Sequence, residues 1–370
     1  MKKINQYVLL LSLTVISSCN AQIAKKNSLK DSFKKDFYIG TALTVAQIEE
    51  KNAKEDSLIK KEFNAITAEN GMKSMFIHSE KDKYDFALAD KFVAYGKKNK
   101  MFLHGHTLIW HSQLAPWMEK IKDSTEMKAF MKDHITTIVS KYKGKIDSWD
   151  VVNEALNEDG TLRKSVFLNT LGERYLIDAF KLAAAADPKV DLYYNDYNIE
   201  EPAKRAGAIQ LIKKIKAAGG KVDGVGIQGH WRLESPSVEE IEKSIEEYAA
   251  LGLKVAITEL DITVLPNPWD LKGADVNQNF EGSGKMNPYP KTLPDSVQTK
   301  LAERYASIFK VFLKHKDKIS RVTFWGVHDA QSWLNDWPIK GRTNYPLLFD
   351  TALKPKKAYN SVISLKGVKK

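Results

Sequence analysis

The sequence has almost no cysteine. Cys19 is the only one among 370 residues, so no disulfide can form within the chain. The N-terminal apolar stretch, residues 7–16, has about ten residues and is too short to cross a bilayer as a helix. Internal repeats are not visible, and no linker rich in glycine, serine or proline divides the chain. We therefore expect one large core and no disulfide scaffold.

Several catalytic motifs are missing as well. The chain has no HExxH zinc motif, no glycine-rich phosphate loop after its first strand and no GxSxG nucleophile elbow. These absences argue against a zinc peptidase, a nucleotide-dependent enzyme and an esterase. His104, His106 and His111 could imitate a metal cluster, but recognition of hydroxyl groups explains the same residues without a metal. We expect neither a metal nor a cofactor.

Acidic residues are fewer than basic ones, 46 against 57, and the formal net charge is +11. Lys2 and Lys3 are the only charged residues before residue 19, so the remainder carries two charges fewer, +9. A basic excess can indicate nucleic acid or an acidic polymer as the partner. The lysines are spread along the whole chain, however, and no basic run alternates with aromatic residues as a nucleic-acid groove requires. We expect a solvated basic surface and no nucleic-acid partner.

The N-terminus has the pattern of an export signal. A positive start at Met1–Lys3 precedes the apolar stretch, and the string Ile16-Ser17-Ser18-Cys19 resembles a bacterial lipobox. We interpret residues 1–18 as a lipoprotein signal peptide, Cys19 as the lipidated residue and residues 19–35 as a polar tether. The expected location is the outer membrane or cell surface of a bacterium, with the lipid as the only membrane contact. The alternative is an ordinary signal cut near Ala21, which would give a secreted protein.

From residue 36 onward, short apolar runs alternate with amphipathic segments. The predicted strands are 37–42, 65–68, 101–107, 146–152, 190–195, 224–228, 254–258 and 321–327. The predicted helices are 47–62, 87–99, 126–142, 173–186, 203–217, 238–251, 298–316 and a weaker one after Pro355. Eight such alternations predict an α/β fold, a (β/α)₈ TIM barrel forming a single catalytic domain over residues 36–370. The longest loop, 260–297, is expected to be functional.

Polar clusters follow the predicted strands where a parallel barrel forms its active site. Two of these clusters contain a glutamate that closes an apolar strand, Glu154 after IDSWDVVN and Glu259 after KVAIT. By our count these are strands four and seven, on opposite sides of the barrel, so the two carboxyl groups can face each other across a bound sugar. Glycoside hydrolysis requires such a pair, one protonated and one ionised.

Seven strings identify a resemblance to the family 10 glycoside hydrolases, chiefly endo-1,4-β-xylanases: TAENGMK, HGHTLIWH, WDVVNEA, YNDYN, VGIQGHW, ITELDI and FWGVHDAQSWL. They are ordered and spaced as in that family and extend from about residue 36 to 365. The resemblance implies an endo-1,4-β-xylanase that cleaves internal bonds of xylan with retention of configuration. It also implies that Glu154 is the acid/base and Glu259 the nucleophile.

The neighbouring polar and aromatic residues fit the same chemistry. Asn153 can hydrogen-bond a sugar 2-hydroxyl, and His230 with Asp261 can hold Glu259 ionised, while Gln228 is expected near Glu154. Indole rings cover the apolar faces of sugars, and amide, carboxyl and amino groups bind their hydroxyls. The expected substrate-binding residues are Glu69, Asn70, Lys73, His106, Trp110, Asn195, Trp325 and Trp333.

Two rival functions remain open at this point. A β-1,4-glucanase could use the same barrel, because xylose differs from glucose only in lacking the C5 hydroxymethyl group. A non-catalytic glycan-binding lipoprotein is the other, although it could lose either glutamate without losing affinity. The expected partner is xylan or a xylo-oligosaccharide, and the expected oligomeric state is a monomer.

Overall fold

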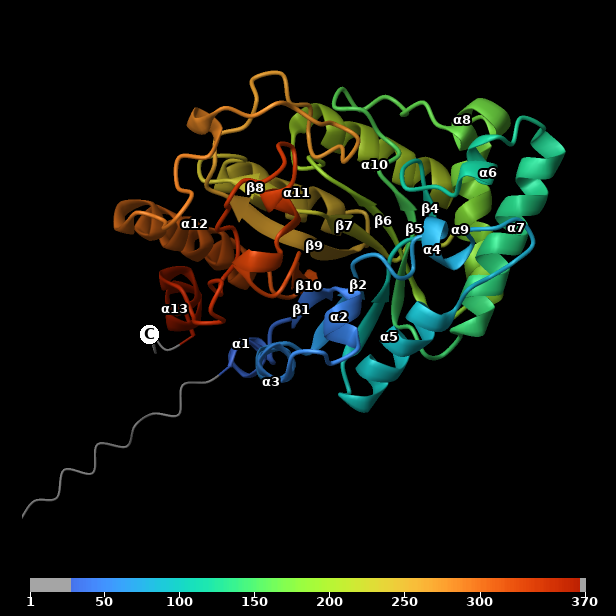
Figure 1. Ribbon diagram of the computed structural model, residues 1–370. Helices are drawn as coiled ribbons and strands as arrows, with labels where there is room; N and C mark the ends of the chain where they lie inside the picture. Colours follow the sequence, from blue (N-terminus) through green and yellow to red (C-terminus); the bar gives the residue numbers. More distant parts are fainter. Residues whose placement is uncertain (1–27, 367–370) are drawn as a thin grey trace, which may run out of the picture.

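Eight parallel strands close into a barrel in the computed structural model, which describes residues 28–366 (Figure 1). Each barrel strand pairs in parallel with its neighbours, and the last strand pairs with the first to complete the ring. The barrel strands are β1 (Tyr38–Leu43), β2 (Ala65–Ala68), β3 (Phe102–Gly105), β5 (Ser148–Asn153), β6 (Asp191–Asp196), β7 (Gly224–Ile227), β9 (Lys254–Thr263) and β10 (Ile319–Phe324). The predicted TIM barrel is confirmed.

Helices surround this barrel and bury their apolar faces against it (Figure 1). The longer ones are α3 (Ala53–Glu62), α5 (Ala87–Lys98), α7 (Ser124–Lys141), α9 (Arg174–Ala186), α10 (Pro202–Ala217), α11 (Val238–Ala249), α12 (Asp295–Lys314) and α13 (Lys357–Ser364). Short helices α2 (Val45–Ile48), α4 (Ser74–Ile77), α6 (Pro116–Glu119) and α8 (Val166–Leu171) lie between them. Within residues 28–366, no helix is long and apolar enough to cross a membrane.

The predicted helix 47–62 is wrong as a single element, because the chain forms two helices there. Thr44 caps α2 with a full capping box, and the helix ends at Ile48. Asn52 then starts α3 by accepting hydrogen bonds from the Lys54 and Glu55 amides. The two cap residues therefore outweigh the amphipathic pattern that joins the segments in sequence.

The predicted tether is also too long at its C-terminal end. Residues 29–33 form helix α1 (Leu29–Phe33), and the side chains of Leu29 and Phe33 are fully buried. Phe33 packs against Phe37 and Phe309, each with ring centroids 5.4 Å apart, and the Leu29 amide donates to Glu62 Oε2 at 2.9 Å. Burial of two large side chains explains why this short segment folds onto the barrel. The predicted signal peptide and Cys19 lie outside the described residues.

Two short strands and one long strand shape the open end of the barrel. β4 (Ile109–Trp110) pairs with β5, and β8 (His230–Arg232) pairs with β9. β9 continues to Thr263, well past the predicted end at Thr258. The connection that follows, residues 264–294, contains only one 3-10 turn, η1 (Gly284–Met286), and is drawn in orange at the top of Figure 1.

Candidate active site

Glu154 is the residue directly after β5, and its backbone has a φ of +55°, a conformation that side-chain-bearing residues rarely adopt. This turn follows a register shift between Asp150 and Val152 in the pairing with β6. The carboxyl group is buried and accepts three hydrogen bonds. Trp110 Nε1 donates to Oε2 at 2.9 Å, and Gln228 Nε2 and Asn153 Nδ2 donate to Oε1 at 3.0 and 3.2 Å. The β4–β5 pairing places Trp110 beside Asn153 and so accounts for the first of these bonds.

Glu259 lies within β9 and is also buried. Asn195 Nδ2 donates to its Oε1 at 2.8 Å, and the same amide donates to Asn153 Oδ1 at 2.9 Å. Thr258 Oγ1 fixes Asn195 by donating to its Oδ1 at 2.6 Å. A side chain at Gly226 would place its Cβ 2.2 Å from that oxygen, so glycine is required there. Asn153 and Asn195 thus connect the two carboxyl groups through side-chain amides.

His230 links Glu259 to Asp261. Its Nε2 lies 3.3 Å from Glu259 Oε2, and its Nδ1 lies 3.0 Å from Asp261 Oδ1. The β8–β9 pairing sets His230 opposite Asp261, and Trp333 Nε1 donates to the other Asp261 oxygen at 2.8 Å. Because both ring nitrogens face carboxylates, both donate, as they do in the charged imidazolium.

The two glutamates experience opposite electrostatic environments. Burial raises the pKa of Glu154 above its usual range and outweighs the hydrogen bonds from Gln228 and Trp110, which act the other way. Burial would also raise the pKa of Glu259, but the His230 hydrogen bond and the charges of His106 and His230 outweigh it and hold the pKa below its usual range. Burial lowers the pKa of His230, but Asp261 and Glu259 reverse that effect and raise it to about 10. The pKa values of the two carboxyl groups are therefore shifted in opposite directions.

The cleft over this pair has a volume of about 110 Å³. It brings together every predicted site residue in the described chain except Asn195 and Asp261, which form hydrogen bonds with Glu259 and His230. Lys73 Nζ bonds Asn70 Oδ1 at 3.0 Å and lies 5.2 Å from the Trp110 ring centroid. The cleft is lined by Glu69, Asn70, Lys73, His106, Trp110, Gln113, Asn153, Glu154, Gln228, His230, Glu259, Ala274, Val276, Trp325 and Trp333.

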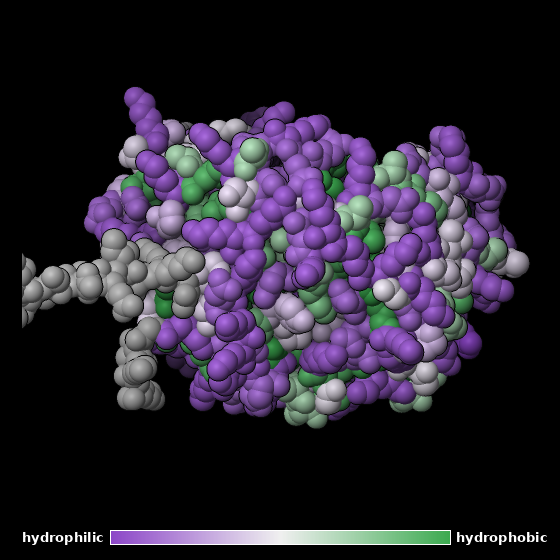
Figure 2. All heavy atoms as spheres, turned by 90° about the horizontal axis from the view of Figure 1, so that it is seen from below, coloured by the Kyte–Doolittle hydropathy of each residue, from purple (hydrophilic) through white to green (hydrophobic). Residues whose placement is uncertain are grey.

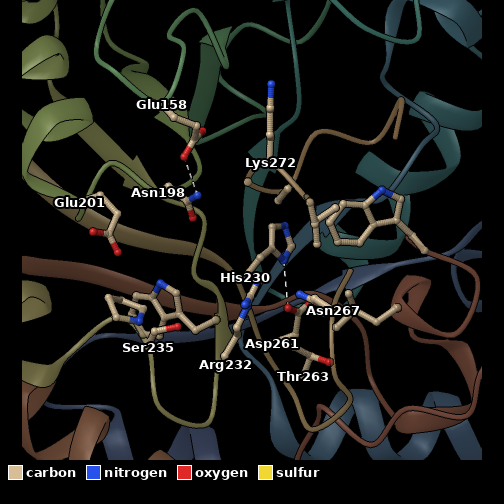
Figure 3. Close-up of a pocket in the computed structure, with 17 residues that line it drawn as sticks. Glu158, Asn198, Glu201, His230, Arg232, Ser235, Asp261, Thr263, Asn267 and Lys272 are labelled. Carbon is tan, nitrogen blue, oxygen red and sulfur yellow. Dashed lines mark hydrogen bonds and ion pairs between the residues drawn. The ribbon is translucent and has the colours of Figure 1, made fainter. Parts of the chain in front are cut away.

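Figure 3 shows a second and larger cavity. It adjoins the cleft at His230 and Ala274, which line both. Its volume is about 440 Å³. His230 and Asp261 lie near the centre of the view in Figure 3, and Asn198 donates to Glu158 at 2.8 Å on another wall. Polar side chains from connecting loops and from the ends of β8 and β9 reach this cavity, chiefly Asn198, Glu201, Arg232, Thr263, Asn267 and Lys272.

The sequence analysis assigned no role to three groups of residues that the structure places in or beside the site. Asp150 Oδ2 lies 3.0 Å from His106 Nδ1 and 2.9 Å from His104 Nε2, so one carboxylate positions both histidines. Thr258 fixes Asn195, and connecting loops supply further lining of the larger cavity, such as Asn198, Asn267 and Lys272. A charged residue inside the apolar string SWDVV is a signal that could have identified Asp150, since buried charges require partners. The loop residues carried no comparable signal.

His104, His106 and His111 do not form the metal cluster that their spacing could imitate. His104 and His106 share Asp150, and burial lowers the pKa of His111 to about 4. Across the part of the chain that the structure describes, the one group with the spacing of a three-residue cation site is Glu242, Glu246 and His315, on α11 and after α12. That group is separate from the cleft, and Lys314 already pairs with Glu242 there.

Comparison with known proteins gives a consistent result. The model of the family described as glycosyl hydrolase family 10 matches residues 28–365. Endo-1,4-beta-xylanase A of Xylanibacter ruminicola is 42% identical over 370 residues, which cover 99% of this chain and 100% of that protein. Beta-1,4-xylanase of Dictyoglomus thermophilum is 40% identical, covering 91% and 90%. A solved family 10 endoxylanase from a sugarcane soil metagenome has a TM-score of 0.88 and 47% identity, covering 91% of this chain and 100% of that one.

Proposed function

The chain belongs to glycosyl hydrolase family 10, and on that basis we propose that it is an endo-1,4-β-xylanase with a retaining mechanism. One observation carries the proposal: two buried glutamates, joined through Asn153 and Asn195, have pKa values shifted in opposite directions. A retaining glycosidase needs a protonated acid and an ionised nucleophile at the same cleft. Glu154 fits the first role and Glu259 fits the second.

The proposed reaction proceeds through a covalent intermediate. Glu154 gives its proton to the glycosidic oxygen while Glu259 attacks the anomeric carbon, so the bond to the leaving sugar breaks and a glycosyl ester forms. Water then attacks the same carbon as Glu154 takes its proton, and Glu259 is released. The imidazolium of His230 stabilises the ionised carboxylate of Glu259 before the first step and again after the second, when the ester has been broken.

Xylan is the proposed substrate because the relatives at 42% and 40% identity are named as xylanases. The shape of the cleft is compatible with that choice. Trp325 and Trp333 form one wall close to His230. Both indoles meet the imidazole edge to face, with ring centroids 6.3 Å away for Trp325 and 4.9 Å away for Trp333. Xylose lacks the C5 hydroxymethyl group, so it fits against flat indole faces with less steric demand than glucose.

Product analysis on three polymers tests this function. Purified protein is incubated in parallel with xylan, mixed-linkage β-glucan and soluble cellulose, and viscosity and product length are followed. We expect viscosity of the xylan to fall early, with short xylo-oligosaccharides as products. Faster attack on either glucan would indicate the β-1,4-glucanase instead. Release of xylose alone from chain ends would contradict endo-cleavage, and binding without products would indicate the glycan-binding lipoprotein.

The N-terminal pattern supports a proposal about location. We infer that the protein is exported and anchored to a bacterial membrane through a lipid on Cys19, and that it acts as a monomer. Its motivation is the string Ile16-Ser17-Ser18-Cys19 after a short apolar stretch. In cells that make lipoproteins, Cys19→Ala should move activity from the detergent-extracted membrane fraction to the soluble fraction. If the unaltered protein is already soluble, an ordinary cleaved signal replaces the lipid anchor. A dimer in gel filtration with light scattering would correct the oligomeric state.

A further inference from the structure

Trp269 is an unusual residue for a folded surface. Among residues 28–366 it is the most exposed of the large hydrophobic side chains, at 96%, and Tyr38 follows at 46%. An indole left in water gives up the free energy that burial of its large apolar area would provide. Figure 2 shows that the face seen there carries its apolar side chains in small, separate patches among hydrophilic ones. Because burial would stabilise so large an apolar side chain, the 96% exposure of Trp269 requires an explanation particular to its position.

Its position is the rim of the larger cavity. Asn267 and Leu271, two residues before and two residues after Trp269, both line that cavity. Consecutive Cα atoms are about 3.8 Å apart, so the Trp269 backbone lies within about 8 Å of each of these wall residues. The opening of the cavity and the indole are thus neighbours on the same loop.

This loop is held in place although the indole is not. Arg342 is buried and donates to the Pro266 carbonyl at 2.9 Å and to the Trp337 carbonyl at 3.0 Å. The Leu271 backbone amide closes a turn by donating to the Pro268 carbonyl at 3.2 Å. The side-chain amide of Asn267 lies 3.0 Å from Arg232 Nη2. The backbone that carries Trp269 is therefore fixed in advance of binding, which lowers the entropy lost when a ligand covers the ring.

An aromatic path connects the cleft with this cavity. Trp333 lines the cleft and stacks on Trp337 with ring centroids 4.5 Å apart and planes at 23°, and Trp337 lines the larger cavity. Glu69, Asn70 and Lys73 line the cleft but not the larger cavity. A sugar chain that crosses Glu154 and Glu259 from the Glu69 side would therefore continue into the larger cavity.

We propose that Trp269 is a stacking platform for a xylosyl residue on the leaving-group side, beyond the sugars held inside the cavity. The inference rests on the proposed xylanase function. A xylosyl ring has no hydroxymethyl group, so its C–H face is flat and can cover one face of an indole. The polar cavity wall binds hydroxyls, and the indole at its rim binds the next apolar face. Trp269 is thereby a specificity determinant for chain length.

The test compares substrates of different length. Specificity constants and product patterns are measured for the unaltered protein and for Trp269→Ala, Trp269→Phe and Tyr38→Ala on an aryl xylobioside, xylotetraose and xylohexaose. Tyr38 is the matched control, because it is an exposed aromatic residue at the start of β1, at the opposite end of the barrel from the cleft. Trp269→Ala should lower kcat/KM for xylohexaose about five- to tenfold, the effect of uncovering one indole face. The loss should shrink as the substrate shortens.

Trp269→Phe should restore most of the loss, and Tyr38→Ala should match the unaltered protein on all substrates. Trp269→Ala should also shift the cleavage of xylohexaose away from products with a long leaving portion. Equal losses on all three substrates would mean that Trp269 only supports its loop, and no loss on xylohexaose would mean that no sugar reaches it. Either result overturns the platform. Failure of the unaltered protein to cleave xylohexaose would instead overturn the xylanase function, and the platform with it.

Discussion

Glu154 and Glu259 differ in what surrounds them more than in where they lie. Both are buried at the same cleft, yet Glu154 faces the neutral donors Trp110 and Gln228, whereas Glu259 faces the charged His230. Neutral donors do not offset the cost of burying a charge, so the pKa of Glu154 lies above its usual range. A cation does offset that cost, so the pKa of Glu259 lies below its usual range. The proposed division of labour therefore depends on the residues around the pair.

Substitution of each glutamate should separate the two chemical steps. With an aryl xylobioside that has a good leaving group, the first step of Glu154→Ala needs no proton and should survive, and the glycosyl ester should accumulate because no base activates water. Azide needs no base, so adding it should raise turnover about tenfold or more, the contribution typical of a general base. The product, identified by NMR, should be the β-glycosyl azide.

Glu259→Ala is the matched control, since it removes the nucleophile and cannot form the glycosyl ester with any substrate. A β-azide from the Glu154 variant requires two inversions at the anomeric carbon. An α-azide would indicate an inverting enzyme. Accumulation and rescue in the Glu259 variant, with the Glu154 variant inert, would mean that the two roles are reversed.

The pH profile of kcat/KM should depend on His230 in one limb only. Activity requires Glu259 ionised and Glu154 protonated, so the acid limb reports Glu259 and the alkaline limb reports Glu154. His230→Gln removes the cation that lowers the pKa of Glu259, so the acid limb should move to higher pH. The alkaline limb should stay in place, because burial and the neighbours Gln228, Trp110 and Glu259 set the pKa of Glu154. A parallel displacement of both limbs would contradict this assignment.

At the scale of elements, the alternation of apolar runs predicted the barrel because buried parallel strands and amphipathic helices leave strong patterns. The strand ends also predicted the cleft. Of the twelve residues expected to bind substrate or support catalysis, ten line it with the two glutamates, and Asn195 and Asp261 are hydrogen-bonded to its lining. Short elements escaped. α1 has only five residues, and β4 and β8 form by pairing with segments that are distant in the sequence. Local hydrophobic periodicity therefore does not predict them. Much of the wall of the larger cavity belongs to loops, whose course depends on tertiary contacts such as those of Arg342.

Helix α1 provides a test of where the folded domain begins. Phe33→Ala should lower the free energy of unfolding by about 3 kcal/mol, because it removes a fully buried ring from contact with Phe37 and Phe309. Denaturant unfolding monitored by circular dichroism measures the change. Lys35→Ala, at an exposed position of the same segment, is the control and should alter stability little. Equal stability of the two variants would instead support the predicted tether that extends to residue 35.

At the scale of the whole molecule, the positive charge should influence substrate choice weakly. The formal net charge of +11 comes from lysines distributed along the chain. At 0.1 M salt, interactions between exposed charges are largely screened beyond about 10 Å. Raising the ionic strength should therefore lower kcat/KM on glucuronic-acid-decorated xylan by about twofold or more, while neutral arabinoxylan changes less. Initial rates on both polymers across a salt series measure the difference, and an identical response would remove charge from the account of substrate choice.

The interior position of Glu259 in β9 constrains how atoms can move during the proposed reaction. The Glu259 amide donates to the Gln228 carbonyl at 2.7 Å, and the carbonyl of the following residue, Leu260, accepts from the Trp325 amide at 3.1 Å. Asn195 and His230 form hydrogen bonds with the two carboxyl oxygens. A nucleophile restrained at backbone and side chain cannot swing toward its target. The anomeric carbon must therefore move instead, away from the departing oxygen beside Glu154 and toward a stationary Glu259. The sugar ring is then the moving part, and the barrel wall is the fixed one.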